Sequence, residues 1–355
     1  MTTTNALPPE ANADYLTSAL SKAGVLDDGH VRDVEPENPR DTILSHIVRL
    51  KLTYEGGAVG APPSLILKTA RSDRLDPSWA SGRQEVAFYT QVAPRLSAGL
   101  IPRSFDAGWS AETNVWHLLL EDLTETHMTA TIWPLPPTLD QCEVIVQSLA
   151  RVHAEWWDDP NLGVSVGAWL DADALDRNMR TFAGHLTRLI DQFSDRIPAE
   201  RRELYERLFD AAPRLRQRYL SHRNATIVHG DAHVWNCLLP RDAKDSTVRF
   251  FDWDSWRVDV GSSDLAYMLA MHWYPDRRRR YERRLLDQYH EVLLGCGVVG
   301  YDRSALADDY RLSVLLRITT PVWQAANNIP PIIWWNNLER IFLAVDDLDC
   351  RELLD

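Results

Sequence analysis

Residues 228–236 read Val-His-Gly-Asp-Ala-His-Val-Trp-Asn, and residues 250–254 read Phe-Phe-Asp-Trp-Asp. Each stretch begins with apolar residues that suit a short buried strand and continues into polar residues that suit a loop. Asp231 precedes Asn236 by five positions, and Asp252 follows Asn236 by 16. We therefore expect two carboxylates and one amide on loops that follow successive strands.

This set of side chains suits phosphoryl transfer. That reaction requires a carboxylate near the acceptor hydroxyl, oxygen ligands for the metal ion on the triphosphate, and a cation on the phosphates. An Asp base, an Asn ligand and a second Asp ligand on adjacent loops also outline the protein-kinase catalytic arrangement. A second interpretation takes His229, Asp231 and His233 as metal ligands of a hydrolase, since catalytic zinc sites favour histidine. It leaves Asn236 and Asp252 without a role.

The chain before residue 121 has the pattern of a small sheet. Apolar and polar residues alternate from Val48 to Tyr54, and Leu65–Lys68 suits the partner strand of a hairpin. Residues 81–92 are expected to form a helix, and residues 115–120 a buried strand. The first third of the chain is therefore predicted to be β-rich.

The chain after residue 126 has mainly helical spacing. Thr138 and Gln141 form a capping-box pattern that predicts the start of a helix. Pro275, Pro321 and Pro330-Pro331 are expected to mark breaks. Helices are predicted over 139–152, 174–193 and 198–221 and from 263 onward, with short strands near 227–228 and 248–251.

Composition and charge narrow the classes of function. The net charge of −13 argues against a nucleic-acid-binding surface and against docking on an anionic membrane. The four cysteines are far apart and contain no CxxC pair, so neither a zinc framework nor a disulfide scaffold is expected. The N-terminus does not resemble a signal peptide, and no run approaches the roughly 18 apolar residues of a membrane span. A cytoplasmic enzyme is expected.

Residues 229–236 match His-Gly-Asp-x-x-x-x-Asn, the form that the aminoglycoside phosphotransferase and choline kinase superfamily carries where protein kinases have His-Arg-Asp. The chain resembles that superfamily from about residue 43 to its end. Some of its motifs look especially similar to the ecdysteroid-kinase-like branch and its bacterial relatives. These are Leu120-Glu121-Asp122-Leu123, Leu149-Ala150-Arg151-Val152-His153-Ala154, Asp252-Trp253-Asp254 and Asp264-Leu265-Ala266-Tyr267.

The resemblance implies an α+β, protein-kinase-like fold with two lobes. A nucleotide-binding lobe would span residues 1–120, a hinge 121–126, and a catalytic and acceptor-binding lobe 127–355. The implied reaction is ATP-dependent transfer of the γ-phosphate to a hydroxyl of a small organic molecule, with Mg²⁺ as cofactor and GTP as an alternative donor.

The resemblance also implies roles for the motif residues. Asp231 would orient or deprotonate the acceptor hydroxyl. Asn236 and Asp252 would bind magnesium. His229 would support the catalytic loop, and Asp264 would support it through hydrogen bonds.

A second group of residues is implied to bind the nucleotide. Lys68 stands where the family places its phosphate-binding lysine, and Glu85 on the next helix would pair with it. The backbone of Glu121, Asp122 and Leu123 would meet the adenine.

The segment that should cover the phosphates departs from the family pattern. Residues 35–42, taken as the loop between the first helix and the first strand, contain no glycine. Backbone amides can still cradle phosphate if the turn has room. Thr42 or Ser45 would then add hydroxyl groups.

Aromatic residues in the helical part suggest where an acceptor would bind. Aromatic walls suit a sugar face, an apolar body or a quaternary amine, although most buried tryptophans serve core packing. Aminoglycoside, macrolide, nucleoside antibiotic, choline-like amine, sugar and steroid-like alcohol all remain open. The candidate acceptor-binding residues are His233, Asp254, Trp256, Trp273, Trp323, Trp334 and Trp335.

Two further functions share these features. A nucleotide-binding regulator without turnover would have the same fold, and the glycine-free segment favours it. A kinase for protein hydroxyls is disfavoured because no Ala-Pro-Glu motif follows Asp252. The sequence does not indicate an oligomeric state.

Overall fold

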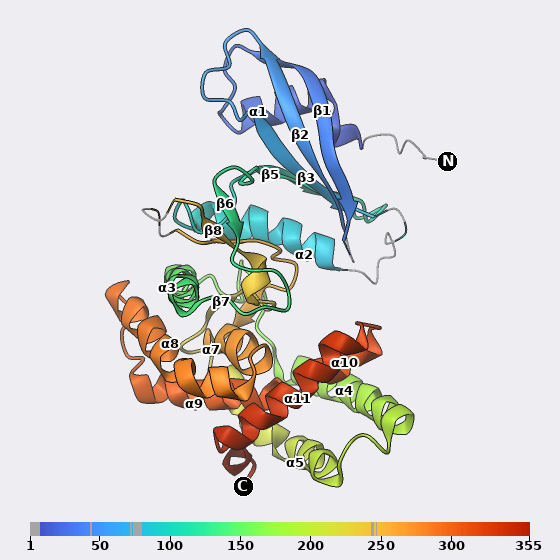
Figure 1. The fold of residues 1–355 in the computed structure, drawn as a ribbon, viewed down its shortest axis with the longest axis vertical. Coiled ribbons are helices and arrows are strands. Elements are labelled where there is room, and N and C mark those ends of the chain that lie inside the picture. The colour runs from blue at the N-terminus through green and yellow to red at the C-terminus, as the bar shows by residue number, and fades with distance from the viewer. Residues whose placement is uncertain (1–7, 43–44, 72, 74–79, 243–244, 246) are drawn as a thin grey trace. The chain divides into compact units, whose positions relative to one another are not determined.

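The computed structural model describes residues 8–42, 45–71, 73, 80–242, 245 and 247–355 of the chain. The chain forms two compact units (Figure 1). The first comprises the chain up to Thr129 together with Leu238–Trp256, and the second comprises Ala130–Cys237 and Arg257–Asp355. The predicted lobe and hinge boundaries remain a prediction, and no sequence pattern had indicated that Leu238–Trp256 joins the first unit.

An antiparallel sheet of five strands, in the order β1-β2-β3-β5-β4, dominates the first unit (Figure 1). The alternation from Val48 to Tyr54 was predicted and lies within β2, where the apolar residues face the core. Residues 35–41 were expected to be a loop. They form the end of β1, a mostly exposed edge strand, where a proline can be accommodated. The strands are β1 (His30–Asp41), β2 (Ser45–Glu55), β3 (Ser64–Ala70), β4 (Ser104–Trp109) and β5 (Trp116–Glu121).

Helix α1 (Ala13–Lys22) contributes to the core of this sheet. Its N-cap is Asn12, whose side chain accepts hydrogen bonds from the first helical N–H groups. Leu16 and Leu20 are fully buried in one cluster with Leu50 and other apolar side chains of β2 and β3. The helix expected over 81–92 is present as α2 (Ser81–Ala87) followed by a π-helical segment (Phe88–Val92).

A small second sheet completes the first unit. Its order is β6-β8-β9, and β6 pairs with β8 in antiparallel fashion. These strands were not predicted apart from the run near 248–251, because each is too short for a periodic pattern to show. The strands are β6 (His127–Thr129), β8 (Cys237–Pro240) and β9 (Arg249–Phe250).

The second unit is mainly helical and contains a two-stranded sheet of β7 and β10. The capping box at Thr138 and Gln141 is formed, which confirms the predicted helix start. Pro321 was expected to break a helix. The break lies just before it, between α9 (Arg303–Leu316) and α10 (Thr319–Ala326), and Pro321 stands in the first turn of α10, where the missing N–H costs little.

In the described residues, no helix combines the length and apolar character needed to cross a bilayer.

Together, the β-rich first unit and the helical second unit confirm the predicted α+β class. The elements of the second unit are α3 (Leu139–Glu155), α4 (Ala172–Phe193), α5 (Ala199–Leu215), α6 (Gln217–Leu220), β7 (Thr226–Val228), β10 (Arg257–Asp259), α7 (Ser262–Leu265), α8 (Pro275–Gly295), α9 (Arg303–Leu316), α10 (Thr319–Ala326) and α11 (Pro331–Asp347).

Candidate active site

A buried lysine connects three elements of the first unit. Successive strand side chains point to opposite faces of a sheet, so Leu67 enters the core beside α1 while Lys68 projects from the other face. Nζ of Lys68 lies 2.7 Å from Oε2 of Glu85 on α2 and 2.5 Å from Oδ1 of Asp252. Burial alone would lower the pKa of Lys68, but the charges of Asp252 and Glu85 outweigh it and raise that pKa. The structure thus brings these three predicted residues together around a stable cation.

The environment of Asp252 fixes its carboxylate. Its φ of 67° lies in the left-handed region, which aspartate tolerates better than most residues. The next residue, Trp253, is fully buried and stacks on Phe88 with ring centroids 4.0 Å apart. The side chain of Asp252 is 40% exposed, against 2% for Glu85. Asp252 can therefore contact both the lysine and a ligand.

Asp254, a predicted acceptor residue, belongs to this same cluster of charges. Burial, followed by the charges of Asp252 and Glu85, raises the pKa of Asp254 to about 7. Ser255 donates a hydrogen bond to its Oδ1 at 2.8 Å. Its role toward an acceptor remains a prediction.

The segment expected to meet adenine is held by the side chain of Asp122. Its Oδ2 accepts hydrogen bonds from Arg49 at 2.6 Å and Ser64 at 2.5 Å, and its Oδ1 from the Thr124 hydroxyl at 2.6 Å. Burial raises the pKa of Asp122, but these bonds prevail and lower it to about 2. The carbonyl of Leu123 accepts two backbone N–H groups.

Glu121 closes the same segment on its other side. Its Oε2 accepts from the backbone N–H of Arg103 at 3.1 Å. The segment is therefore well ordered by its own hydrogen bonds, while the adenine contact of Glu121, Asp122 and Leu123 remains a prediction.

The turn between β1 and β2 is closed by hydroxyl groups. Oγ1 of Thr42 lies 2.8 Å from Oγ of Ser45 and accepts from the Ser45 N–H at 3.0 Å. Arg71 donates to the carbonyl of Thr42 at 2.6 Å. Ser45 is 2% exposed, so Thr42 is the better placed of the two for a ligand. Residues 43 and 44 lie outside the described residues.

In the second unit, the predicted catalytic loop follows β7. Nδ2 of Asn236 donates to both the backbone carbonyl and Oδ2 of Asp231, each at 3.1 Å. Nε2 of His233 lies 3.5 Å from Oδ2 of Asp231. The Asp231 side chain is 31% exposed. The structure thus brings Asp231, His233 and Asn236 together, and Asp231 stays accessible to a small ligand.

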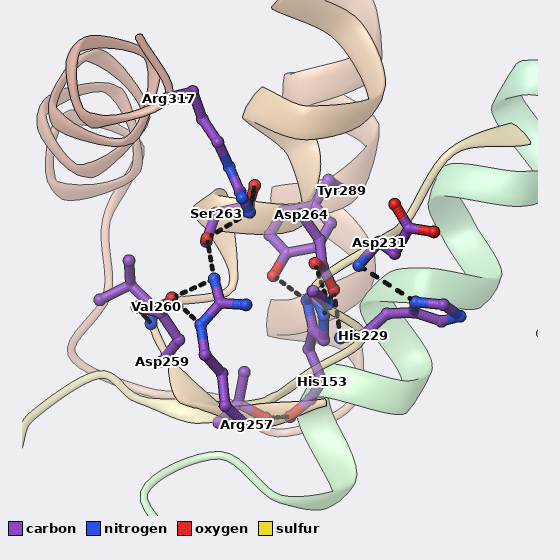
Figure 2. Close-up of polar contacts among 12 residues, drawn as sticks. His153, His229, Asp231, Arg257, Asp259, Val260, Ser263, Asp264, Tyr289 and Arg317 are labelled. Carbon is purple, nitrogen blue, oxygen red and sulfur yellow. Dashed lines mark hydrogen bonds and ion pairs between the residues drawn. The ribbon is translucent and has the colours of Figure 1, made fainter. Parts of the chain in front are cut away.

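A fully buried carboxylate holds this loop in place (Figure 2). Asp264 accepts from the backbone N–H of His229 at 2.7 Å and from that of Gly230 at 2.9 Å. Nε2 of His153 lies 3.2 Å from the same carboxylate, and its Nδ1 lies 2.7 Å from the Tyr289 hydroxyl. In Figure 2 the Asp231 carboxylate points away from this network. Asp264 therefore contacts the loop and leaves Asp231 for other partners.

The predicted role of His229 also has a structural counterpart. Its Nδ1 accepts from the Asp231 N–H at 3.3 Å, and the residue is fully buried (Figure 2). It is the link between the Asp264 network and Asp231.

The predicted tryptophans differ in their surroundings. Trp256 is 2% exposed and donates to the carbonyl of Gln84, which indicates packing in the first unit. Trp273 and Trp334 are 3% exposed, whereas Trp323 is 53% exposed. Trp335 packs edge-on against Trp334. Their roles toward an acceptor remain predictions. Burial favours core packing for Trp256, Trp273 and Trp334.

Sequence reasoning missed three side chains around His233. Trp235, Tyr267 and His272 have ring centroids 5.6, 6.5 and 5.7 Å from the His233 ring. Trp235 and Tyr267 stand inside motifs that were quoted for other residues. His272 had no signal in the sequence.

The candidate ligand atoms fit magnesium. The amide nitrogen of Asn236 donates within its loop, which leaves Oδ1 as the ligand atom, and Asp252 offers a carboxylate. Both are hard oxygen donors, and Mg²⁺ commonly takes few protein ligands together with phosphate oxygens and water. Within the described part of the chain, no three His, Cys, Asp or Glu side chains cluster as a metal site, an arrangement that the hydrolase interpretation requires.

Comparison with known proteins gives one family and several structural likenesses. The model of the phosphotransferase enzyme family matches residues 52–306. A protein from Ralstonia eutropha JMP134 assigned as an aminoglycoside phosphotransferase is 12% identical, with 96% of this chain and 99% of that chain covered and a TM-score of 0.58. A choline/ethanolamine kinase family protein from Mesorhizobium loti is 12% identical over 91% and 92% of the chains, with a TM-score of 0.49. No curated protein sequence matches.

At this low identity the Ralstonia likeness concerns the fold alone, and it confirms the predicted kinase-like, two-lobed fold. The family match runs from β2 into α9 and covers more than half of the 355 residues. It confirms the predicted superfamily, while the ecdysteroid-kinase-like branch remains a prediction. This chain belongs to the phosphotransferase enzyme family.

Proposed function

We propose that this chain transfers the γ-phosphate of ATP, with Mg²⁺, to a hydroxyl group of a small organic molecule. The observation that carries the proposal is the ammonium of Lys68 between buried Glu85 and partly exposed Asp252. A fixed cation next to an accessible carboxylate is what a magnesium-bound triphosphate requires. Membership of the phosphotransferase family supports the same reaction.

Lys68 would bind phosphate oxygens of the nucleotide. Residue Glu85 is 1% exposed, so its carboxylate holds the ammonium without itself contacting solvent or a ligand. The raised pKa of Lys68 keeps the charge in place at any pH near neutrality. Because the cation is already oriented, little reorganisation is needed when the nucleotide binds.

Asn236 and Asp252 would supply oxygen ligands to Mg²⁺. When bound, the ion would neutralise charge on the phosphates. The bonds of Asn236 Nδ2 to Asp231 orient the amide and couple its position to that of the catalytic carboxylate.

Asp231 would position the acceptor hydroxyl and take its proton. The hydroxyl oxygen forms a bond to the γ-phosphorus, the bond from that phosphorus to the β,γ-bridging oxygen breaks, and ADP leaves. Positioning and charge stabilisation supply most of the rate gain in such reactions. The Asp264 bonds to His229 and Gly230 keep the loop that carries Asp231 in one conformation.

A phosphotransfer screen tests the proposal. The protein is incubated with Mg-ATP and, one at a time, kanamycin, erythromycin, uridine, choline, glucose and ecdysone, and mass spectrometry detects the gain of one phosphoryl group. We expect one class to be phosphorylated by the wild type and not by Asp231→Ala. Asp276→Ala is the matched control, since that carboxylate is fully exposed on α8 and should leave transfer unchanged.

Binding of Mg-ATP without any phosphorylated alcohol, in this screen and in a wider one, would contradict the proposal and favour a nucleotide-binding regulator. Equal product from wild type and Asp231→Ala would contradict the role of Asp231.

A further inference from the structure

Four aromatic side chains form a cluster beside Asp231. We call His233, Trp235, Tyr267 and His272 the acceptor wall. Besides their spacing from His233, the rings of Tyr267 and His272 are 4.8 Å apart, and those of Trp235 and His272 are 5.9 Å apart. His233 places one end of the wall 3.5 Å from Oδ2 of Asp231.

The wall has the features of a binding surface. Tyr267 lies in a π-helical segment (Ala266–Met271), a conformation that is frequent at functional sites. Among the described residues, Nδ1 of His233 and Nε1 of Trp235 are buried without a hydrogen-bond partner. Buried polar atoms without partners are uncommon in native proteins and call for an explanation, such as a ligand. Tyr267 is 6% exposed and supports the wall from behind, while the partly exposed rings of His233, Trp235 and His272 offer flat surface beside these two polar atoms.

Positive charge lies next to the wall. The guanidinium of Arg317 lies 4.8 Å from the ring centre of Tyr267, and it donates hydrogen bonds to the carbonyl and hydroxyl of Ser263 (Figure 2). Arg340 packs over the ring of Tyr274 at 4.2 Å, and its Nε is buried without a partner in the part of the chain that the structure describes. Within the same residues, neither arginine forms an ion pair with a carboxylate.

The pKa values near the wall reflect the same excess of positive charge. Burial, followed by the charges of His233, Arg340 and Arg317, lowers the pKa of His272 to about 3, although the hydrogen bond to the Tyr267 carbonyl raises it. Burial and the charge of Arg257 lower the pKa of Arg317 despite Asp264 and Asp259. The charged groups that act on His272 are therefore all bases, whereas Arg317 also has two carboxylates among its neighbours.

We propose that the acceptor of this chain is an uncharged or anionic alcohol with a flat ring, and that polycationic acceptors are excluded. This rests on the proposed phosphotransfer. The ring of the acceptor would stack on the wall with its hydroxyl toward Asp231. An anionic group would be attracted by Arg317 and Arg340, whereas an ammonium group would be repelled by them.

Three probes with one body and one hydroxyl test the charge preference. They are 4-(hydroxymethyl)benzoate, 4-(hydroxymethyl)benzamide and 4-(hydroxymethyl)benzylamine. Calorimetry in the presence of Mg-ADP gives their Kd values. We expect the benzylamine to bind at least about tenfold more weakly than the benzamide, and the benzoate to bind at least as tightly as the benzamide.

Equal or tighter binding of the benzylamine would overturn the proposal, as would the absence of binding by all three probes. In separate samples, each probe is incubated with the protein and Mg-ATP, and phosphorus NMR measures the formation of the phosphate ester. The expected order of Kd values with no ester from any saturating probe would count against phosphotransfer while supporting the wall. Ester formation with the benzylamine as the preferred probe would support phosphotransfer and count against the charge preference assigned to the wall.

Arg317→Gln separates charge from structure, because glutamine can still donate to Ser263. We expect the preference for benzoate over benzamide to fall by at least about threefold while Mg-ATP affinity stays unchanged. Arg283→Gln is the matched control, since its side chain is 93% exposed. An unchanged preference in Arg317→Gln and in Arg340→Gln would overturn the assigned role of the arginines. Trp235→Ala should weaken all three probes alike, and Trp235→Phe should restore them.

Discussion

Replacing Asp264 by asparagine tests how the proposed catalytic loop, residues 229–236, is held in one conformation. In the native loop each carboxylate oxygen accepts one backbone N–H, from His229 at 2.7 Å and from Gly230 at 2.9 Å. An asparagine has one acceptor oxygen, so its NH₂ group would face an N–H group at the other site. The residue is fully buried, and water cannot replace the lost bond.

The cost can be worked out in two ways. A hydrogen bond to a charged group contributes about 1.5–3 kcal/mol, and a buried donor without a partner costs about 1–3 kcal/mol. We therefore expect Asp264→Asn to lower the free energy of unfolding by about 3 kcal/mol. The pKa gives a similar figure. Burial raises the pKa of Asp264, but the bond and charge of His153 and then the charge and N–H of His229 prevail and lower it from 3.8 to about 2. A shift of this size corresponds to about 2 kcal/mol.

The sign of the pH dependence follows from that depressed pKa. The carboxylate contributes stability above the ordinary pKa of 3.8, and this contribution is lost as the pH falls through about 2. The gap between wild type and Asp264→Asn should therefore narrow by about 1 kcal/mol between pH 7 and pH 3. Urea denaturation of both proteins at both pH values, followed by tryptophan fluorescence, measures this difference in stability.

Asp276→Asn is the control, because its carboxylate is fully exposed and its loss should change stability by less than about 0.5 kcal/mol. A loss of unfolding free energy below about 1 kcal/mol in Asp264→Asn would refute the reasoning. A difference in stability between wild type and Asp264→Asn that does not change with pH would also refute it.

Three further changes have expected outcomes. Lys68→Met should weaken Mg-ATP binding at least about tenfold in calorimetry, because it removes the proposed phosphate-binding cation and leaves buried Glu85 unpaired. Lys51→Met should not weaken it, because that side chain is half-exposed on the neighbouring strand; equal affinities of the two variants would count against the nucleotide role of Lys68. Thr138→Ala removes the capping box of α3 and should cost about 1 kcal/mol in urea denaturation, with no change in Mg-ATP affinity; a cost near zero would contradict the capping account. Trp253→Leu should cost about 3 kcal/mol and reduce Mg-ATP affinity, since the stacked ring adjoins Asp252, the proposed metal ligand; unchanged stability would show that the stack is dispensable.

Local patterns predicted the elements whose residues act over short distances. The alternation around Val48 and the capping box at Thr138 were sufficient for β2 and α3. Strand β1 was missed because its proline and charged residues suit a loop as well as an exposed edge. The short strands β8 and β10 were missed because they contain too few residues to show a period.

The residues of the candidate site were predicted from motifs. The contacts around them were mostly not predicted. The pair of Lys68 with Glu85 and the support of the loop by Asp264 followed from the resemblance to a family, whereas the bond from Asp264 to the His229 N–H did not. The contact of Lys68 with Asp252 joins residues 184 positions apart, and only the folded chain shows it. The same is true of His272, which reaches the acceptor wall because a π-helical segment places it there.

A single-turnover experiment tests the proposed reaction most directly. Excess enzyme is mixed with limiting ATP radiolabelled at the γ-phosphate and with the alcohol that the screen identifies. Transfer of label by Asp231→Ala should be at least about a thousandfold slower than by wild type, while its Kd for Mg-ATP stays within about threefold. Transfer by Asp231→Ala at the wild-type rate would contradict the account.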